Sequence, residues 1–296
     1  MDINFEFYKV FYYVAKYKSF SDAASKLYIS QSAVSQSIKI LEQKLGCRLF
    51  IRNTKNIRLT IEGEKLFAYV EQAVNLFSTG ERLIDEMSDL KEGEVRIGAS
   101  DTICRHFLLP YIEKYNTLYP NIKIRIINRT SPVCISLLEK GDVDIAVVNI
   151  NEKYDNKNFK VRMLRQVEDI FVGGKKFSEL KGKGISLAEL TKYPLLALEK
   201  NTNTRVSFDK LFQQHGLDVK PEIELSSTDL LIDMAKIGLG ISYVTKEAAS
   251  IAIDEGSLFQ IKLGKKISPR YLGLMTYKDV PLPAAAQEFV NVILEA

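Results

Sequence analysis

The stretch "SFSDAASKLYISQSAVSQSIKILEQKLGCRLFIR", residues 19–52, decides how the first part of this chain folds. After residue 30 its apolar side chains recur at steps of four, three and four, which is the spacing of one buried stripe on an α-helix. The residues of this stripe are Val34, Ile38, Leu41 and Leu45. Ser30 is suited to cap the start of such a helix and Gly46 to end it. The pattern therefore predicts a helix between these two residues with one face buried.

The opposite face of the predicted helix is short-chained, rich in hydrogen-bonding groups and free of acidic residues. It carries Ser32, Ser35, Gln36 and Lys39. A glutamine can bond the edge of an adenine in the major groove, a serine can bond almost any base edge, and no carboxylate repels the phosphates. An ordinary solvated helix face is the alternative interpretation, but it explains neither the turn before this helix nor the charges around it.

The segments on either side complete a winged helix-turn-helix. Upstream, "SDAASKLY" places small inward-facing side chains at Ala23 and Ala24, which lets two helices cross closely, and "YIS" is a turn of about three residues. A further amphipathic helix precedes them, with its apolar stripe at Phe7, Val10, Phe11 and Val14. Downstream, "RLFIRNTKNIRLT" is typical of a strand, a turn and a second strand. The basic residues of this hairpin suit contact with phosphates or with the minor groove.

Positive charge is concentrated in the first fifth of the chain. Residues 1–60 hold ten Lys and Arg against four Asp and Glu, whereas the remaining 236 residues hold 31 against 33. This distribution is expected if the N-terminal part faces a polyanion such as DNA. On charge alone, a basic surface without a partner is the alternative.

Length and composition indicate the broad class of protein. A chain of 296 residues predicts more than one compact unit, and 46% hydrophobic with 26% charged residues is typical of a chain that buries large cores. No apolar run reaches the length of a membrane span, and the start "MDINFEFYKV" is unlike a signal peptide. Cys47, Cys104 and Cys134 lack CxxC spacing, which favours free thiols in a reducing compartment. We therefore expect a cytoplasmic protein without a membrane partner.

Residues 19–64, which extend the opening stretch through "NTKNIRLTIEGE", resemble the DNA-binding domain of LysR-type transcriptional regulators. The resemblance implies sequence-specific binding to double-stranded promoter DNA by a homodimer or homotetramer. It also implies which residues contact DNA: Ser21, Gln31, Ser32, Ser35, Gln36 and Lys39 around the recognition helix, and Arg52, Asn53, Lys55 and Arg58 in the wing. Many members of the family carry Arg where this sequence has Gln36, a departure that bears on base preference and not on DNA binding.

A long linker helix is predicted after the winged domain, so that residues 1–60 and 61–91 form successive parts. Apolar residues continue in alternating steps of four and three, at Leu66, Val70, Ala73, Phe77, Gly80, Ile84 and Met87. A lone helix would leave such a heptad seam in water, which favours pairing with a second copy. A helix packed on its own domain is the alternative. Members of the family that the chain resembles dimerise through this helix, and two half-site readers need a two-fold spacer.

From Glu94 onward strands and helices alternate, which predicts a mostly parallel α/β sheet covered by helices. The strands of a first set are "EVRIGAS", "IKIRIIN" and "DIAVVN", and those of a second set are "DIFVG", "PLLAL", "EIELS" and "ISYVT". The resemblance implies that residues 92–296 form an effector-binding domain of two lobes, similar to a periplasmic binding protein. Lobe I would contain about residues 92–162 and 268–296, and lobe II about residues 163–267.

Hydroxyl side chains recur where four predicted strands give way to helices. In such sheets ligands bind beyond the carboxyl ends of the strands, and helix N-termini favour small anions. The candidate effector-binding residues are Ser100, Asp101, Thr102, Arg129, Thr130, Ser131, Thr202, Thr204 and Thr228. Arg129 suits an anion and Asp101 an amino group, so we expect a small anion or zwitterion such as an organic acid or an amino acid. Each hydroxyl taken alone is also explained as a helix cap.

Catalytic and metal-binding motifs are not evident in the sequence. No Walker loop, GxGxxG, GxSxG or HExxH occurs, and the two histidines, His106 and His215, are far apart. We therefore expect no enzymatic activity, no metal and no cofactor. Redox sensing by Cys104 and Cys134 is an alternative mode of control. A solute-binding receptor would explain the lobes alone and an enzyme would need a catalytic constellation, so DNA binding distinguishes a regulator from both.

Overall fold

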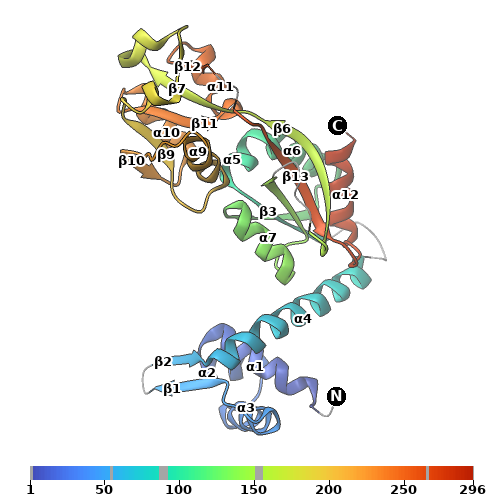
Figure 1. The fold of residues 1–296 in the computed structure, drawn as a ribbon. Helices are drawn as coiled ribbons and strands as arrows, with labels where there is room; N and C mark the ends of the chain where they lie inside the picture. Colours follow the sequence, from blue (N-terminus) through green and yellow to red (C-terminus); the bar gives the residue numbers. More distant parts are fainter. Residues whose placement is uncertain (1–2, 54–55, 87–92, 151–155, 265–266, 296) are drawn as a thin grey trace. The chain divides into compact units, whose positions relative to one another are not determined.

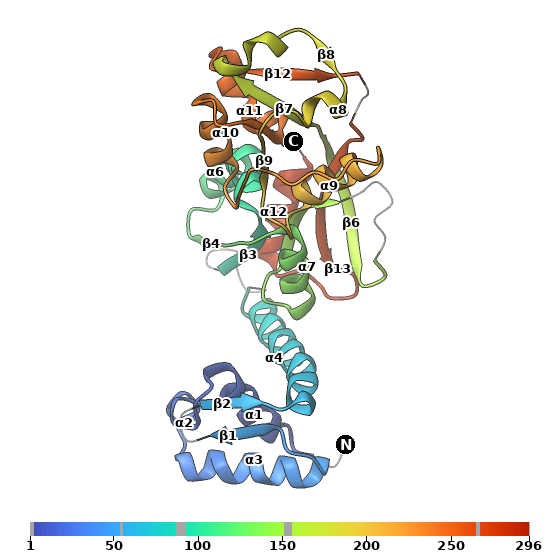
Figure 2. The same ribbon diagram turned by 60° about the vertical axis from the view of Figure 1, so that its left-hand side comes forward.

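The computed structural model describes residues 3–53, 56–86, 93–150, 156–264 and 267–295. The chain forms two compact units (Figures 1 and 2). The first contains the residues up to Asp85 together with Glu139–Asp142, and the second contains the rest. In the described part of the chain no helix combines the length and the apolar character needed to span a bilayer.

Three short helices, a two-stranded sheet and a long helix make up the N-terminal unit (Figure 2). Their bounds are α1 (Phe5–Tyr17), α2 (Phe20–Leu27), α3 (Gln31–Leu45), β1 (Phe50–Asn53), β2 (Asn56–Leu59) and α4 (Ile61–Glu86). Helix α3 starts where the Ser30 hydroxyl accepts a hydrogen bond from the Ala33 amide at 3.2 Å, and it ends at Gly46 with φ +68°. Val34, Ile38 and Leu41 are fully buried. The predicted helix, both of its ends and its buried stripe are therefore confirmed.

The wing is tied to the start of α4 by a close backbone approach. Strands β1 and β2 pair antiparallel, with Phe50 opposite Leu59. Thr60 donates its hydroxyl hydrogen to the Arg48 carbonyl at 2.7 Å and accepts a hydrogen bond from the Gly63 amide at 2.9 Å. A methyl group on Gly63 would lie 2.2 Å from the backbone oxygen of Leu49. Glycine at this position therefore allows α4 to begin against β1.

The first half of α4 packs on its own domain rather than forming a continuous exposed seam. Val70 is 7% exposed and belongs to the core of the N-terminal unit, and Leu66 borders the same core. Phe67 stacks on the Tyr12 ring of α1 with 6.0 Å between centroids, so the aromatic surface of α1 holds this face of the helix. The predicted seam is therefore wrong at Leu66 and Val70. The exposed apolar stripe of α4 consists of Tyr69, Ala73, Leu76, Phe77 and Ile84, so the predicted seam is exposed at Ala73, Phe77 and Ile84.

The C-terminal unit consists of two α/β lobes, as predicted. Lobe I contains β3 (Gly93–Ala99), α5 (Asp101–Ile103), α6 (Leu109–Leu118), β4 (Ile122–Asn128), α7 (Ser131–Lys140), β5 (Ile145–Ile150), β6 (Phe159–Val167), β13 (Arg270–Tyr277) and α12 (Ala284–Leu294). Lobe II contains β7 (Asp169–Gly174), β8 (Gly184–Ile185), α8 (Leu187–Leu190), β9 (Leu195–Leu198), α9 (Asn203–Gln213), β10 (Ile223–Leu225), α10 (Thr228–Lys236), β11 (Ile241–Thr245), α11 (Lys246–Asp254) and β12 (Leu258–Leu263). A π-helical turn, Cys104–Leu108, joins α5 to α6, and a short 3₁₀ helix, Lys175–Leu180, follows β7.

Each lobe is a mixed sheet with helices on both faces. The strand order is β4-β3-β5-β13-β6 in lobe I and β10-β9-β11-β7-β12-β8 in lobe II. In lobe I, α6 and α12 cover one face and α7 the other (Figure 1). In lobe II, α8 and α9 cover one face and α10 and α11 the other. Strands β3, β4 and β5 are parallel, as are β9, β10 and β11, whereas β6, β7 and β13 bring antiparallel pairing.

The two crossovers between the lobes are located by the strands that leave and re-enter lobe I. Strand β6 pairs with β13 along its whole length, from Phe159 opposite Tyr277 to Val167 opposite Arg270. The first crossover therefore lies after Val167, whereas the sequence placed it near residue 162. The sequence pattern also does not predict β6, α11 or β12. The return to lobe I near residue 268 agrees with β13 beginning at Arg270.

Candidate DNA-binding surface and effector site

The predicted base-reading side chains lie on the exposed side of α3. Gln31, Ser32, Gln36 and Lys39 are exposed and Ser35 is half-buried. The hydroxyls of Ser30 and Ser32 lie 2.9 Å apart at the N-terminus of the helix. Lys39 and the amide side chains therefore remain available to a nucleic acid, as a recognition helix requires.

The one carboxylate on α3 is turned toward the wing. The Glu42 Oε1 atom accepts hydrogen bonds from the backbone amides of Leu49 at 2.7 Å and Phe50 at 3.3 Å. Glu42 is half-buried, and the two amides belong to buried residues. This contact removes a negative charge from the exposed face of α3 and fixes the start of β1 relative to that helix. Helical periodicity does not predict this role, because the contact joins residues seven and eight positions apart across a turn.

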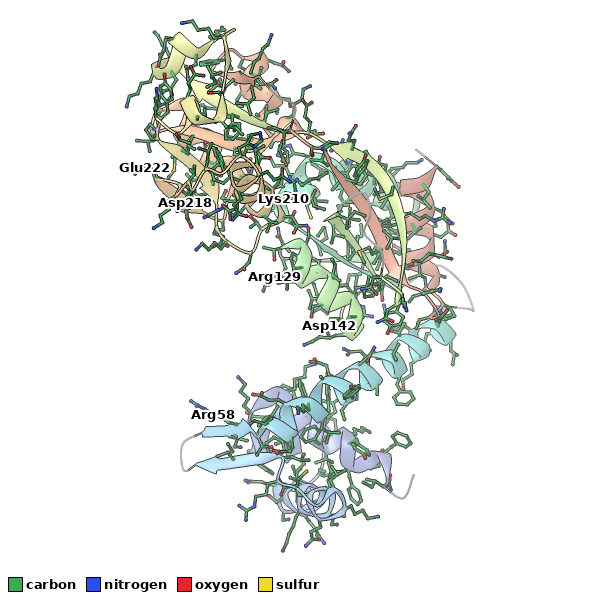
Figure 3. All side chains as sticks on the ribbon, in the orientation of Figure 1. Arg58, Arg129, Asp142, Lys210, Asp218 and Glu222 are labelled. Atoms are coloured by element: carbon green, nitrogen blue, oxygen red, sulfur yellow. The ribbon has the colours of Figure 1, made fainter. Side chains whose placement is uncertain are left out.

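The wing and α2 contribute the other residues predicted to contact DNA. Arg58 is exposed on β2, and Figure 3 shows its side chain projecting from the hairpin. Ser21 is exposed on α2. Arg52 and Asn53 belong to β1 by their backbone register, while their side chains and Lys55 lie outside the described residues. The described members of the set therefore share the solvent-exposed surface formed by α2, α3 and β2.

Two of the predicted effector-binding hydroxyls meet across the lobes. The Oγ1 atoms of Thr102 in lobe I and Thr228 in lobe II lie 2.9 Å apart, and Thr228 is buried while Thr102 is half-buried. Beside them, Arg105 forms an ion pair with Asp229 at 2.5 Å, also between the lobes. Asp229 is thus already paired with a cation. The junction after β3 and the junction before α10 therefore converge, as the hydroxyl pattern predicted.

The remaining predicted hydroxyls are largely engaged within the protein. Ser100 and Thr202 cap their own helices by accepting from the amides of Ile103 and Arg205, at 3.4 Å and 3.2 Å. Buried Ser131 accepts from the Asn149 amide at 3.0 Å, and buried Thr204 accepts from an Arg270 nitrogen at 3.2 Å. The capping interpretation therefore applies to Ser100 and Thr202, while Ser131 and Thr204 hold neighbouring elements in place.

The charged candidates lie on the surface of lobe I. Asp101 accepts a hydrogen bond from the Asn128 side-chain amide at 3.2 Å. Arg129 donates to the Asn128 carbonyl at 2.7 Å and is exposed, as Figure 3 shows. Thr130 is half-buried at the start of α7, and its carbonyl accepts from the Cys134 amide at 2.9 Å. Among the described residues, no hydrogen bond joins the side chain of Asp101 or Arg129 to the hydroxyls of Thr102 and Thr228.

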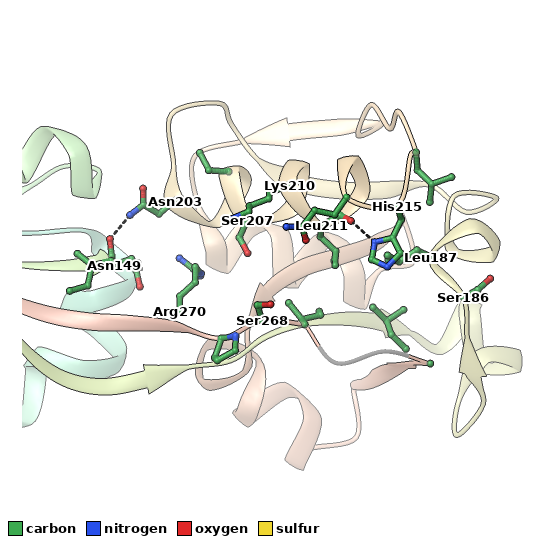
Figure 4. A pocket seen from close by; sticks show the side chains of 18 of the residues that line it. Asn149, Ser186, Leu187, Asn203, Ser207, Lys210, Leu211, His215, Ser268 and Arg270 are labelled. Carbon is green, nitrogen blue, oxygen red and sulfur yellow. Dashed lines mark hydrogen bonds between the residues drawn. The ribbon is translucent and has the colours of Figure 1, made fainter. Parts of the chain in front are cut away.

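A cavity of about 960 Å³ lies beside these junctions, and none of the predicted effector-binding residues lines it. Asn149, Asn203 and Arg270 lie at one end, and Ser186, Leu187 and His215 at the other (Figure 4). Most of the residues that line the cavity belong to α7 and β5 of lobe I, to α8 and α9 of lobe II, and to the second crossover. The side-chain amide of Asn203 donates to the Asn149 carbonyl across the lobes.

Sequence reasoning missed the polar residues of this cavity. One signal was present, because Arg270 is a charged residue at the start of the otherwise apolar strand "RYLGLMTY". Asn203 has no distinguishing pattern in the sequence, because it stands between Thr202 and Thr204 at a junction where the hydroxyls are the recurring feature. His215 is exposed and also borders the cavity.

The thiols give no support to redox control. Burial raises the pKa of Cys104 to about 11 and that of Cys134 to about 11. Both thiols are therefore protonated near neutral pH, where a redox sensor needs thiolate. Across the residues that the structure describes, no three His, Cys, Asp or Glu side chains gather as a metal site would require.

Two family models together match nearly the whole chain. The model described as bacterial regulatory helix-turn-helix protein, lysR family, matches residues 5–64, and the LysR substrate binding domain matches residues 88–296. An uncharacterised HTH-type transcriptional regulator of Methanocaldococcus jannaschii is 27% identical over 292 residues, covering 98% of each chain. A probable RuBisCO transcriptional regulator of Cyanidium caldarium is 29% identical over 290 residues, covering 93% of this chain and 88% of its own.

Solved structures show the same fold along the whole chain. A full-length OxyR variant from Pseudomonas aeruginosa has a TM-score of 0.72 at 18% identity and covers 99% of this chain and 95% of its own. Full-length CbnR in complex with its target DNA has a TM-score of 0.67 at 17% identity and covers 99% of both chains. ArgP from Mycobacterium tuberculosis has a TM-score of 0.72 at 22% identity, covering 97% of this chain and 96% of its own.

Proposed function

Because the chain belongs to the LysR family of regulatory helix-turn-helix proteins, we propose that it reads promoter DNA as a homodimer or homotetramer under the control of a small anion or zwitterion. It is a DNA-binding transcription regulator with a C-terminal effector-binding domain, and not an enzyme. The observation that carries the DNA-reading role is the exposed, acid-free face of α3, with Glu42 turned away toward the wing. We expect the protein to act in the cytoplasm, where it can reach genomic DNA.

The first test concerns base reading by Gln36. Gln36→Ala should cost about 1–3 kcal/mol at one base pair of each half-site, because it removes a bidentate contact to a base edge. Arg58→Ala should instead weaken all sequences alike and flatten the salt dependence, because a wing cation meets phosphate. Fluorescence anisotropy on a duplex from upstream of the protein's own gene and on a scrambled duplex measures both effects.

The control for this test is Gln43→Ala, an exposed glutamine near the other end of α3. It should leave binding to both duplexes unchanged. If Gln36→Ala weakens the upstream and the scrambled duplex equally, Gln36 does not read a base. If neither duplex is bound more tightly than the other by the wild type over a range of salt, sequence-specific binding to that region is excluded.

The exposed stripe of α4 supports a second copy of the chain as partner. Tyr69 is 75% exposed, Phe77 63% and Ile84 71%, and the three follow one face of the helix. Phe5 of α1 extends the stripe, with its ring centroid 6.4 Å from that of Phe77. Two copies can cover this surface by pairing their α4 helices, which also gives the two-fold arrangement that paired half-sites need.

Control by an effector is supported by the meeting of Thr102 and Thr228 at junctions from opposite lobes. A ligand whose groups replace this hydroxyl contact would bind one arrangement of the lobes better than another, and it can shift their equilibrium only by that difference. The effector class we propose, an organic acid or amino acid, matches the helix N-terminus at α10 and the polar groups around it. Ser100, Thr130, Ser131 and Thr202 complete the proposed site, with Asp101, Arg129 and Thr204 at its edge.

The second test concerns the effector. A thermal-shift screen of the full-length protein with amino acids, organic acids and inorganic anions finds a ligand, and calorimetry measures its affinity. Thr102→Val keeps the side-chain shape but removes a hydroxyl, so it should weaken binding up to about tenfold, the worth of one hydrogen bond, while ligand-free DNA affinity stays intact. Thr117→Val on α6, whose hydroxyl bonds only the Glu113 carbonyl among the described contacts, is the matched control. A footprint that no bound ligand alters would exclude effector control.

A further inference from the structure

The second crossover holds a buried arginine with one unused donor. Arg270 is 6% exposed and pairs with Asp169, itself 2% exposed, through Nε at 2.6 Å and Nη2 at 2.5 Å. Nη2 also donates to the Thr204 hydroxyl at 3.2 Å. The Nη1 atom is buried and has no hydrogen-bond partner among the described residues. A buried charged donor without an acceptor is costly and rare in native proteins, so this atom calls for an explanation.

The same arginine forms one end of the cavity of about 960 Å³. Asn149, Asn203 and Ser207 lie at that end with it, and Lys210 follows along the same face of α9 (Figure 4). The Ser207 hydroxyl lies 3.1 Å from the buried Tyr243 hydroxyl, which fixes its position. A volume of this size accommodates a metabolite-sized ligand, and a small number of polar groups at one end is what orients such a ligand.

Away from Arg270 the wall of the cavity is mainly apolar. Aliphatic side chains from α8, α9, the segment after α9, β12 and the crossover face it, namely Leu187, Leu211, Leu217, Leu263 and Ile267. His215 borders the far end, where its Nδ1 atom is engaged with the Leu211 carbonyl at 2.9 Å. A ligand that fills this space must therefore carry its charge at one end and an extended apolar body behind it.

We propose that this cavity binds an elongated monocarboxylic acid, with its carboxylate on Arg270 and its apolar body along α9. The charge of Arg270 is already balanced by Asp169, so Nη1 is its spare charged donor and this end of the cavity suits a single carboxylate, while the exposed Lys210 lies further along α9. A polyanion would leave further charge next to Asp169 and against an apolar wall, which is unfavourable. The inference rests on the proposed function in one respect: this ligand would be an effector of the regulator.

Binding here would be linked to the contact between the lobes. Asn203 is the chain neighbour of Thr204, which bonds Arg270, and its amide donates to the Asn149 carbonyl of the other lobe. A carboxylate that bonds Nη1 would lie at the end of the cavity that Asn149 and Asn203 also line. A ligand here that competes with the Asn149 carbonyl for the Asn203 amide would weaken a contact between the lobes and so change their equilibrium.

The test uses decanoate, decanol and acetate with the full-length protein in isothermal titration calorimetry. Decanoate should bind one site per chain. Decanol, which keeps the body and lacks the charge, should bind at least tenfold more weakly, and acetate, which lacks the body, should give no saturable heat. Equal affinity for decanoate and decanol would overturn the role of Arg270, and a decanoate titration without saturation would overturn the site.

Variants of the cavity residues test whether decanoate binds at Arg270. The double variant Arg270→Gln with Asp169→Asn replaces the ion pair by a neutral hydrogen-bonding pair and should lower decanoate affinity about tenfold to a hundredfold. Arg205→Gln is the matched control, because Arg205 is an equally buried arginine that pairs with Asp209 and Glu224 and does not line the cavity. Unchanged decanoate affinity in the folded double variant would overturn the proposal.

If the double variant does not fold, a wall variant decides. Leu211→Gln introduces an amide beside the apolar body of the ligand on half-buried surface, so circular dichroism should remain that of the wild type. Its decanoate affinity should fall at least tenfold, and an unchanged affinity would overturn the proposal.

Footprinting separates this proposal from the function on which it rests. If decanoate fails to bind while an amino acid or small organic acid binds and alters the footprint, the carboxylic-acid site is wrong and effector control stands. If decanoate binds in the cavity but neither it nor any other ligand alters the footprint, the site stands and effector control is wrong.

Discussion

The contact between Glu42 and the wing allows a prediction whose size can be worked from the structure. In Glu42→Ala, two backbone amides of buried residues, Leu49 and Phe50, lose their shared acceptor. An unsatisfied buried donor costs about 1–3 kcal/mol, and the 3.3 Å bond to Phe50 is the weaker of the two, so we expect a local loss of about 2–4 kcal/mol. Glu42→Gln keeps an acceptor oxygen on the same stem and should lose about 1 kcal/mol or less.

Hydrogen exchange measured by mass spectrometry on the full-length protein reports this loss of stability at the residues where it occurs. A loss of 2–4 kcal/mol lowers amide protection over residues 47–59 by about 30-fold to 1,000-fold, since each factor of ten corresponds to 1.4 kcal/mol. Protection in lobes I and II should not change. Gln43→Ala, an exposed neighbour on α3, is the control for loss of a polar side chain on the same helix.

The DNA affinity of the same variants is an independent measurement, because the two possible orientations of Glu42 predict changes in opposite directions. If the carboxylate faced DNA, removing it would strengthen binding, because a negative charge would leave the interface. Because Glu42 is turned toward the wing, we expect Glu42→Ala to weaken binding to the upstream duplex as the hairpin loses its position. Tighter binding by Glu42→Ala, or exchange over residues 47–59 no faster than in Gln43→Ala, would refute this account of Glu42.

Other positions give three further expectations. Val70→Asp should destabilise the N-terminal unit by several kcal/mol because it buries an unpaired charge, whereas Phe77→Asp should leave circular dichroism unchanged and raise the dissociation constant of the homo-oligomer in sedimentation velocity. A wild type that sediments as a monomer at micromolar concentration would contradict the prediction for Phe77→Asp. Gly63→Ala should lower the thermal midpoint because its methyl meets a carbonyl oxygen at 2.2 Å, while Gly80→Ala, with no atom within 4 Å, should not lower it. Since burial raises the pKa of Cys104 to about 11, its alkylation should be slow near pH 7 and should accelerate about tenfold per pH unit until about pH 11; rapid alkylation near pH 7 would contradict this.

The parts of the fold that the sequence predicts are those set by local chemistry. Helix α3 is defined by its stripe of apolar residues and by caps at Ser30 and Gly46, all of which act within a few residues. The parallel strands of both lobes are predicted for a similar reason, since each is a short stretch between turns in which apolar residues either follow one another or alternate with polar ones. These features require no knowledge of distant partners.

The features that the sequence did not predict depend on contacts between distant residues. Val70 and Phe77 are seven residues apart on one face of helix α4, and periodicity alone cannot show that Val70 meets the core of the N-terminal unit while Phe77, two turns further on, is exposed. Strand β6 is half-exposed and is held by β13, about a hundred residues further along the chain, so its own composition does not mark it. The burial and the unused donor of Arg270 likewise depend on its ion pair with Asp169, which lies in the other lobe.

Contacts between the lobes explain why a small ligand is sufficient to control their arrangement. The Thr102–Thr228 hydrogen bond is between neutral groups and is worth about 0.5–1.5 kcal/mol. The Arg105–Asp229 pair contributes little, because its side chains are 61% and 36% exposed and solvent screens their attraction. Breaking contacts of this strength requires a few kcal/mol, which a ligand with a hundredfold preference for one arrangement supplies, about 2.7 kcal/mol. The contacts at these two junctions are therefore weak enough for an effector to change.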